Sequence, residues 1–124
     1  MGTESREEGS ARQRGMEMME AVYGFSVDPD TEESDYLKQT VDHLFGEIWS
    51  QPELTIRDRR LITIGAIAAM GIGPLLEVQF KAALDHDELD KEQVRALVVH
   101  LAHYVGWPLS TLARDAAEKA IAGP

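Results

Sequence analysis

The sequence contains no cysteine, and this absence excludes several kinds of chemistry at once. Disulfide bonds, thiolate metal ligands, cysteine nucleophiles and cysteine redox pairs are all impossible in this chain. We expect a reducing, cytoplasmic location, although a chain without cysteine suits any compartment.

Long apolar runs are missing as well. The longest run with few charges covers residues 61–76, and Gly71, Gly73 and Pro74 interrupt it. It is too short and too broken to cross a bilayer. The polar N-terminal stretch has no apolar signal-peptide core, so we expect residues 1–10 to form a mobile acidic tail.

Positive charge is scarce. The chain has 12 basic against 22 acidic residues, which leaves a net charge of -10. Such a surface repels phosphates and anionic lipids, so we expect no nucleic-acid partner and no membrane partner. Apolar residues, in contrast, make up 44% of the 124 residues, which is enough for one hydrophobic core. We therefore expect a single domain over residues 11–124.

Turn signals divide the chain into about six helical segments, and no stretch shows the alternation of a strand. The predicted fold class is a compact all-α bundle. The predicted boundaries rest on Gly24 as a helix end, on Thr55 and Asp90 as caps, and on prolines near helix starts. The expected helices cover about residues 12–23, 33–49, 55–70, 73–84, 90–105 and 107–122, and residues 26–31 are expected to form a loop.

The third predicted helix has no polar face over residues 61–70. A helix that is apolar all round must be buried on every side, which is difficult in so small a domain. A subunit interface would supply the missing cover, so we expect a homo-oligomer.

The fifth predicted helix carries the densest set of reactive side chains. His100 and Tyr104 are four residues apart and project from the same face, with His103 at its edge and Trp107 beyond. A histidine can exchange a proton near neutral pH. The alternative is that these rings make hydrogen bonds at a helix or subunit contact. His100 and His103 could also face one metal ion, but no carboxylate completes the set, and we expect no metal.

Two further groups are candidates for substrate binding. Arg57, Arg59 and Arg60 form a basic cluster, and arginine suits carboxylate recognition. Salt bridges to the many acidic residues are the alternative for this cluster. Glu47 lies among aromatic residues, where the pKa of a carboxyl can rise, although an exposed position is equally compatible with the sequence.

Several motifs occur in a fixed order: FGEIWSQP at 45–52, LTIRDR at 54–59, LITIGA at 61–66, LEVQFKAAL at 76–84 and HLAHYVGWP at 100–108. Together they resemble the carboxymuconolactone decarboxylase family, and residues 14–24 resemble its first helix. The resemblance implies an all-α fold of the alkylhydroperoxidase-D-like type whose protomers form rings, commonly trimers or hexamers. It also implies sites near subunit contacts, no metal or organic cofactor, and decarboxylation of 4-carboxymuconolactone to 3-oxoadipate enol-lactone in aromatic catabolism.

The sequence departs from the peroxidase branch of this superfamily at every member of its proton relay. When that branch is aligned on the LITIGA motif, the resemblance places its glutamate, two cysteines and histidine at Arg60, Ile72, Leu75 and Gln79 of this chain. Thiol peroxidase activity is therefore excluded on chemical grounds. Glutamine at 79 can donate a hydrogen bond but cannot deliver a proton near neutral pH.

The leading hypothesis is a decarboxylase-like enzyme acting on a small carboxylated lactone. Arg59 or Arg60 would hold the carboxylate, and His100 or His103 would act as the acid and base. Gln79 and Tyr104 would donate hydrogen bonds to the enolate, while Trp107 and Glu47 would complete the pocket. The competing hypothesis is a non-catalytic oligomeric binding or scaffold protein that has kept the fold.

Overall fold

The computed structural model describes the backbone of residues 2–123 and the side chains of residues 10–31 and 33–123. Within that range every regular element is helical, as the sequence predicts. The residues form two compact units, an N-terminal unit of residues 1–55 and a C-terminal unit of residues 56–124. The sequence led us to expect one domain over residues 11–124, and the packing of the two units into one domain stays a prediction.

The N-terminal unit begins with α1, Gly2–Tyr23, which starts earlier than the predicted helix and ends before Gly24 as expected. Gly24 has a φ of 85°, a left-handed conformation that suits glycine at a helix end. Residue 1 and the side chains of residues 2–9 belong to the predicted tail and lie outside the described residues. The mobility of that tail stays a prediction.

The predicted loop at residues 26–31 contains one helical turn, and on this point the sequence interpretation was wrong. This turn is α2, Pro29–Glu32, and the Asp28 carboxylate caps it by accepting a hydrogen bond from the amide of Asp30. Proline at the first helical position is already set to a helical φ and has no amide to leave unpaired.

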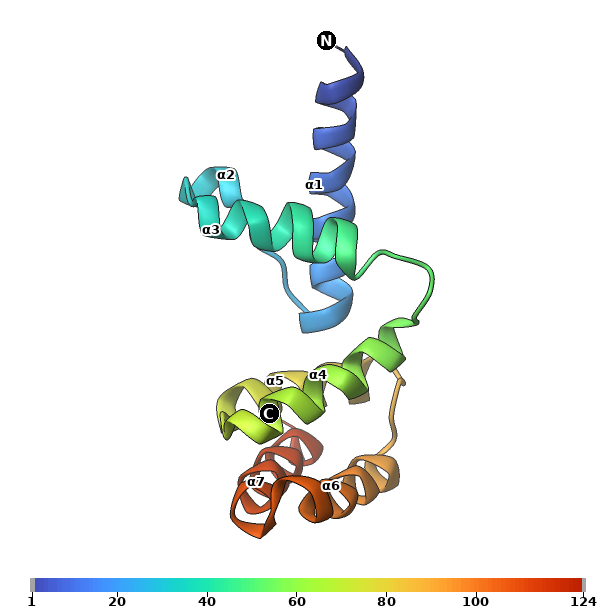
Figure 1. Cartoon of the computed structure of the whole chain (residues 1–124), viewed down its shortest axis with the longest axis vertical. Coiled ribbons are helices and arrows are strands. Elements are labelled where there is room, and N and C mark those ends of the chain that lie inside the picture. Colours follow the sequence, from blue (N-terminus) through green and yellow to red (C-terminus); the bar gives the residue numbers. More distant parts are fainter. Residues whose placement is uncertain (1, 124) are drawn as a thin grey trace. The chain divides into compact units, whose positions relative to one another are not determined.

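The predicted second helix consists of two parts with different hydrogen-bond spacing. α3, Asp35–Lys38, is capped by Ser34 and continues into the π-helix η1, Gln39–Ile48. After η1, the amide of Trp49 donates to the carbonyl of Leu44 five residues earlier. Figure 1 shows α3 and η1 as one continuous rod beside α1. Between α1 and η1 lie the buried side chains of Met19, Val22, Val41, Phe45 and Trp49.

The C-terminal unit contains four helices whose boundaries agree closely with the predicted ones. They are α4 Ile56–Met70, α5 Gly73–Asp85, α6 Lys91–Val105 and α7 Trp107–Ala122. Asp90 and Gln93 form the predicted capping box at the start of α6. Pro74 and Pro108 lie in the first turns of α5 and α7, also as predicted.

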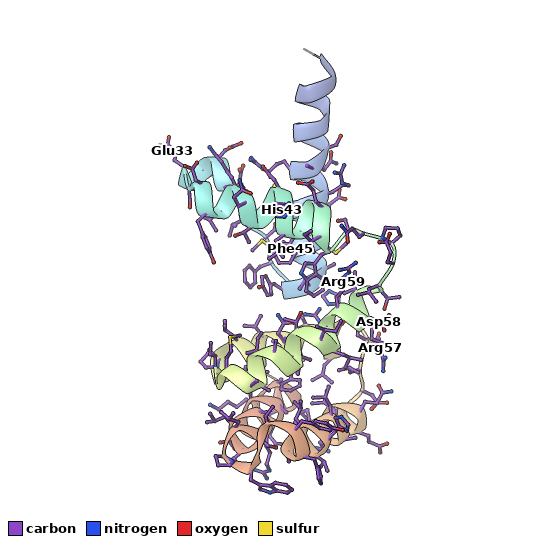
Figure 2. The ribbon with its side chains drawn as sticks, viewed as in Figure 1. Glu33, His43, Phe45, Arg57, Asp58 and Arg59 are labelled. Atoms are coloured by element: carbon purple, nitrogen blue, oxygen red, sulfur yellow. The ribbon has the colours of Figure 1, made fainter. Side chains whose placement is uncertain are left out.

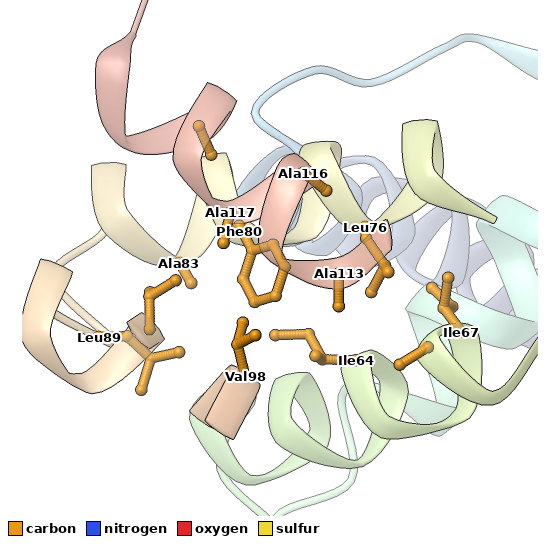
Figure 3. Close-up of a cluster of buried hydrophobic side chains, with 13 residues drawn as sticks. Ile64, Ile67, Leu76, Phe80, Ala83, Leu89, Val98, Ala113, Ala116 and Ala117 are labelled. Carbon is orange, nitrogen blue, oxygen red and sulfur yellow. The ribbon is translucent and has the colours of Figure 1, made fainter. Parts of the chain in front are cut away.

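The core of this unit lies between these four helices (Figure 3). Ile64 of α4 and Phe80 of α5 are completely buried at its centre, beside Val98 of α6. α7 contributes small side chains, Ala113, Ala116, Ala117 and Ala120, which let its backbone come close to its neighbours. None of the helices described is long and apolar enough to span a membrane.

One face of α4 is covered by this core and the other is exposed. Ile64, Ile67 and Ala68 are buried, whereas Ile62 and Met70 are each 62% exposed. The enclosure that the sequence predicts for residues 61–70 is therefore only half present within a single chain.

Candidate functional site

The centre of the C-terminal unit holds a charged side chain that is completely buried. Arg60 belongs to the first half of α4, and its side chain is 0% exposed. Its Nε donates to Oε1 of Glu88 at 2.8 Å, and its Nη2 donates to Oε2 of the same carboxylate at 3.1 Å. Two parallel bonds of this kind match the planar guanidinium to the carboxylate and fix both groups.

A third bond from the same guanidinium reaches Gln79. Nη1 of Arg60 donates to Oε1 of Gln79 at 2.7 Å, and Gln79 is only 3% exposed. Arg60 and Gln79 are two of the positions at which the sequence is expected to depart from the peroxidase branch, and in the structure they are directly hydrogen-bonded.

Glu88 is brought to Arg60 by the turn between α5 and α6. Asp87 adopts a left-handed φ of 56°, and this reverses the chain just before Glu88. Arg57, one turn before Arg60, donates from Nε to the backbone carbonyl of Glu88 at 2.9 Å. Two arginines of α4 therefore hold the turn through both its backbone and its side chain.

Glu88 is the site residue that the sequence analysis missed. The basic cluster did predict acidic partners for its arginines, and for Arg60 that alternative is confirmed by the contact with Glu88. The sequence does not identify Glu88 as the acidic partner, because 28 residues separate it from Arg60 and only the fold brings them together.

The rings at the end of α6 and the start of α7 form two pairs. The rings of His100 and Tyr104 are 4.9 Å apart, and those of His103 and Trp107 are 5.4 Å apart in an edge-on arrangement. These pairs confirm the predicted common projection of His100 and Tyr104. Tyr104 is 78% exposed and Trp107 is 64% exposed, so this face points to solvent in a single chain.

His103 has a defined hydrogen-bonding state. Its Nδ1 lies 2.9 Å from the carbonyl oxygen of Val99. A carbonyl can only accept, so Nδ1 must carry the hydrogen. In the neutral ring Nε2 then holds the lone pair and is the atom that can take up a proton.

The proposed catalytic residues do not share one environment within a single chain. Gln79 is buried and bound to Arg60, whereas His100, His103 and Tyr104 lie on the exposed face of α6. Their roles in catalysis stay predictions. Among the described residues, no three His, Asp or Glu side chains gather as a metal ion would require.

The two remaining candidates lie in different units. Arg59 is half-buried in the first part of α4, next to Asp58 (Figure 2). Glu47 belongs to η1 in the N-terminal unit, where it is exposed and its Oε1 lies 3.4 Å from Nδ1 of His43. Of the two environments that the sequence allows for Glu47, the structure shows the exposed one.

Comparison with known proteins gives two findings. A sequence model of the "Carboxymuconolactone decarboxylase family" matches residues 34–119. The similarity of residues 14–24 to the family's first helix lies outside that match. The chain is also 32% identical over 75 residues to a 4-carboxymuconolactone decarboxylase of Acinetobacter baylyi, a match that covers 60% of this chain.

The relative is the longer protein, since the aligned part covers only 55% of its length. The chain thus spans about half of the curated protein that it matches. The family match, in contrast, includes η1 and almost all of the four-helix unit that contains Arg60, Gln79 and Glu88. On this basis the chain belongs to the carboxymuconolactone decarboxylase family.

Proposed function

We propose that this protein catalyses decarboxylation, or a closely related proton transfer, on a small carboxylated lactone of aromatic catabolism without a metal or an organic cofactor. The family membership and the name of the Acinetobacter relative support this reaction class. The observation that carries the proposal is the buried contact between Arg60 and Gln79. It provides an amide hydrogen-bond donor, held in place away from bulk solvent, for an oxygen that gains negative charge.

The reaction needs a group that stabilises the electron pair left by CO2 and a group that donates one proton. The bond between the lactone carbon and its carboxylate breaks, CO2 leaves, and the electron pair moves toward the lactone carbonyl to give a dienolate. A hydrogen bond from Gln79 to that oxygen would be stronger in the transition state than in the ground state, which lowers the barrier. One proton delivered to carbon then completes the product.

The proton source that we propose is a histidine of α6. His103 is favoured over His100 because the Val99 carbonyl holds its ring through Nδ1 and leaves Nε2 for contact with a substrate. Tyr104 would be a second donor to the enolate and Trp107 a wall of the pocket. Arg59 is favoured for the substrate carboxylate, because its side chain is only half-buried whereas that of Arg60 is completely buried. The role of Glu47 in substrate binding stays a prediction.

A second copy of the chain is part of the proposal. The exposed apolar face of α4, with Ile62 and Met70, would be covered by another protomer in a homo-oligomer, a trimer or a hexamer. Such an assembly would also provide a neighbouring surface for the exposed rings of α6 and could enclose a site that one chain leaves open.

The direct test mixes the purified protein with 4-carboxymuconolactone and follows CO2 release, with the subunit number measured by light scattering. Replacing His103 by Gln is expected to lower the rate by about 100-fold or more, the usual contribution of a general acid. Replacing His100 by Gln is the matched control and should have a smaller effect. An assembled oligomer without turnover would rule out this substrate, and two unaffected variants would rule out the acid–base assignment.

The alternative function is a non-catalytic oligomeric binding or scaffold protein. It is favoured by the glutamine at 79, which cannot replace a proton donor. Thermal unfolding with a panel of lactones and dicarboxylates distinguishes the two. A ligand present at about a hundred times its Kd should add roughly 2.7 kcal/mol of stability. No response across the whole panel would favour the scaffold.

A further inference from the structure

Arg60 fixes the orientation of the side-chain amide of Gln79, that is, which side its oxygen and its nitrogen face. A guanidinium has only N–H donors and no acceptor, so the group that faces it must be the amide oxygen. The 2.7 Å contact between Nη1 of Arg60 and Oε1 of Gln79 meets this requirement. The opposite orientation would place two donors against each other inside the protein.

Glu88 prevents Arg60 from moving away from this position. Its carboxylate accepts from both Nε and Nη2 of Arg60, and only 11% of the Glu88 side chain is exposed. The guanidinium plane is therefore fixed on one edge while Nη1, on the other edge, reaches Gln79. The order of contacts is Glu88, then Arg60, then Gln79, all within the C-terminal unit.

This chain of contacts leaves the amide nitrogen of Gln79 on the side away from Arg60. Among the described residues, the side chain of Gln79 makes its hydrogen bond through the amide oxygen. The amide nitrogen is not one of the fully buried atoms that lack a partner, so it keeps some access to solvent and can donate to water or to a ligand. The position is therefore suited to a ligand atom that accepts a hydrogen bond.

The charge of this cluster indicates which kind of acceptor is preferred. The positive charge of Arg60 and the negative charge of Glu88 are in direct contact and cancel at a distance. A carboxylate at Gln79 would lose its hydration without meeting a net positive charge, which is costly in a buried place. A carbonyl oxygen loses much less hydration and accepts the same hydrogen bond.

We propose that Glu88 and Arg60 are positioning residues that orient Gln79 as a donor toward the uncharged carbonyl oxygen of a lactone, and not toward its carboxylate. This inference rests on the proposed function and assigns the two ends of the substrate. The carbonyl that becomes the enolate lies at Gln79, and the carboxylate that leaves as CO2 lies elsewhere.

The first experiment measures binding without turnover. The probes are 2(5H)-furanone, a lactone that only accepts hydrogen bonds, and 2-furoate, a carboxylate of similar size. In the wild-type protein, addition of 2(5H)-furanone, but not of 2-furoate, is expected to shift the side-chain amide NMR signals of Gln79, which are identified by sequential assignment of the wild-type protein itself. No shift with the wild-type protein would overturn the inference, and this result needs no variant to fold.

Two nearly isosteric variants test the orientation. Gln79→Glu replaces the donor by an acceptor, and furanone binding should weaken by about tenfold or more, the loss of one hydrogen bond. Glu88→Gln offers Arg60 one acceptor oxygen in place of two and sets an amide N–H group against the other donor, so Arg60 holds Gln79 less firmly. Furanone binding should then weaken by about threefold or more, but by less than in Gln79→Glu.

The outcomes separate this inference from the proposed function. Equal furanone affinity in the wild-type protein and in Gln79→Glu would overturn it, as would a Glu88→Gln variant that binds furanone as tightly as the wild-type protein does. A protein that binds furanone through Gln79 but releases no CO2 from 4-carboxymuconolactone would support the orientation and reject the reaction. Turnover with furanone binding that does not depend on Gln79 would do the reverse.

Discussion

Gly15 of α1 lies directly against the backbone of Val41 in η1. A Cβ atom built on Gly15 would stand 1.8 Å from the carbonyl oxygen of Val41. Gly46 of η1 repeats the arrangement in the other direction, with a Cβ position 2.5 Å from the carbonyl oxygen of Ala11. The close packing of α1 on η1 therefore depends on one glycine from each helix.

The first prediction concerns Gly15→Ala. The added methyl group forces α1 and η1 apart, and overpacking of this kind costs about 1–3 kcal/mol. The free energy of unfolding, measured in urea through the fluorescence of buried Trp49, should fall by that amount. The control is Gly73→Ala, where no atom lies within 4 Å of the added Cβ and the stability should change by less than about 1 kcal/mol. Equal effects in the two variants would contradict the packing.

The second prediction concerns the buried ion pair of Arg60 and Glu88. Arg60→Met leaves the carboxylate of Glu88 without its partner inside the unit, and this should lower the free energy of unfolding by about 3–5 kcal/mol. The double variant Arg60→Met with Glu88→Met removes both charges and should recover most of the loss. Urea unfolding of the two single variants and the double variant gives the coupling energy. A double variant less stable than both single variants would contradict the prediction.

The third prediction concerns the turn before Glu88. Asp87 has a φ of 56°, a left-handed conformation that aspartate tolerates better than most L-residues and that glycine adopts without steric strain. Asp87→Gly removes the strain that remains and also loosens the unfolded chain, so the net gain in stability should be no more than about 0.5 kcal/mol. Ala96→Gly, on the exposed side of α6, is the control and should lose about 1 kcal/mol. A loss at both positions would show that Asp87 is not strained.

Helix boundaries were predictable wherever a local signal sets them. The hydrogen bonds of the Asp90–Gln93 capping box and the prolines at the start of α5 and α7 depend only on residues within one turn. Where the structure differs, the cause is not local. The π spacing of η1 is a choice between two hydrogen-bond registers for the same amphipathic segment, and its residue pattern is compatible with either.

The candidate site was predictable in its residue types and less so in its contacts. The family pattern pointed to positions 60 and 79, which proved to be hydrogen-bonded neighbours. It did not point to Glu88, because no motif in the neighbouring sequence distinguishes this glutamate from the other acidic residues, 22 in all. The exposure of Tyr104 and Trp107 was not predictable either, since a ring in a helical stripe can face a core or a partner.

The last prediction concerns pH and the exposed pair of Arg95 and Glu118, which joins α6 to α7. Nε and Nη2 of Arg95 donate to the two oxygens of Glu118 at 3.2 and 3.1 Å. This contact lowers the pKa of Glu118 and raises that of Arg95. The folded protein therefore holds the Glu118 proton less tightly than the unfolded chain does. The stabilisation is present above the ordinary glutamate pKa of about 4.3 and is lost as pH falls through the lower folded value.

Thermal unfolding of the wild-type protein and of Glu118→Gln tests this directly. The wild-type Tm should be the higher one at about pH 7, the difference should be small because exposed pairs contribute little, and it should shrink as the pH falls below about 4. Arg95→Gln should lower the Tm at about pH 7 in the same way, and Glu118→Gln should have no further effect in that background. High salt should reduce the difference by screening the pair. A Tm difference that grows as the pH falls would mean that the sign of the linkage is wrong and that Glu118 stabilises the folded chain in its protonated form.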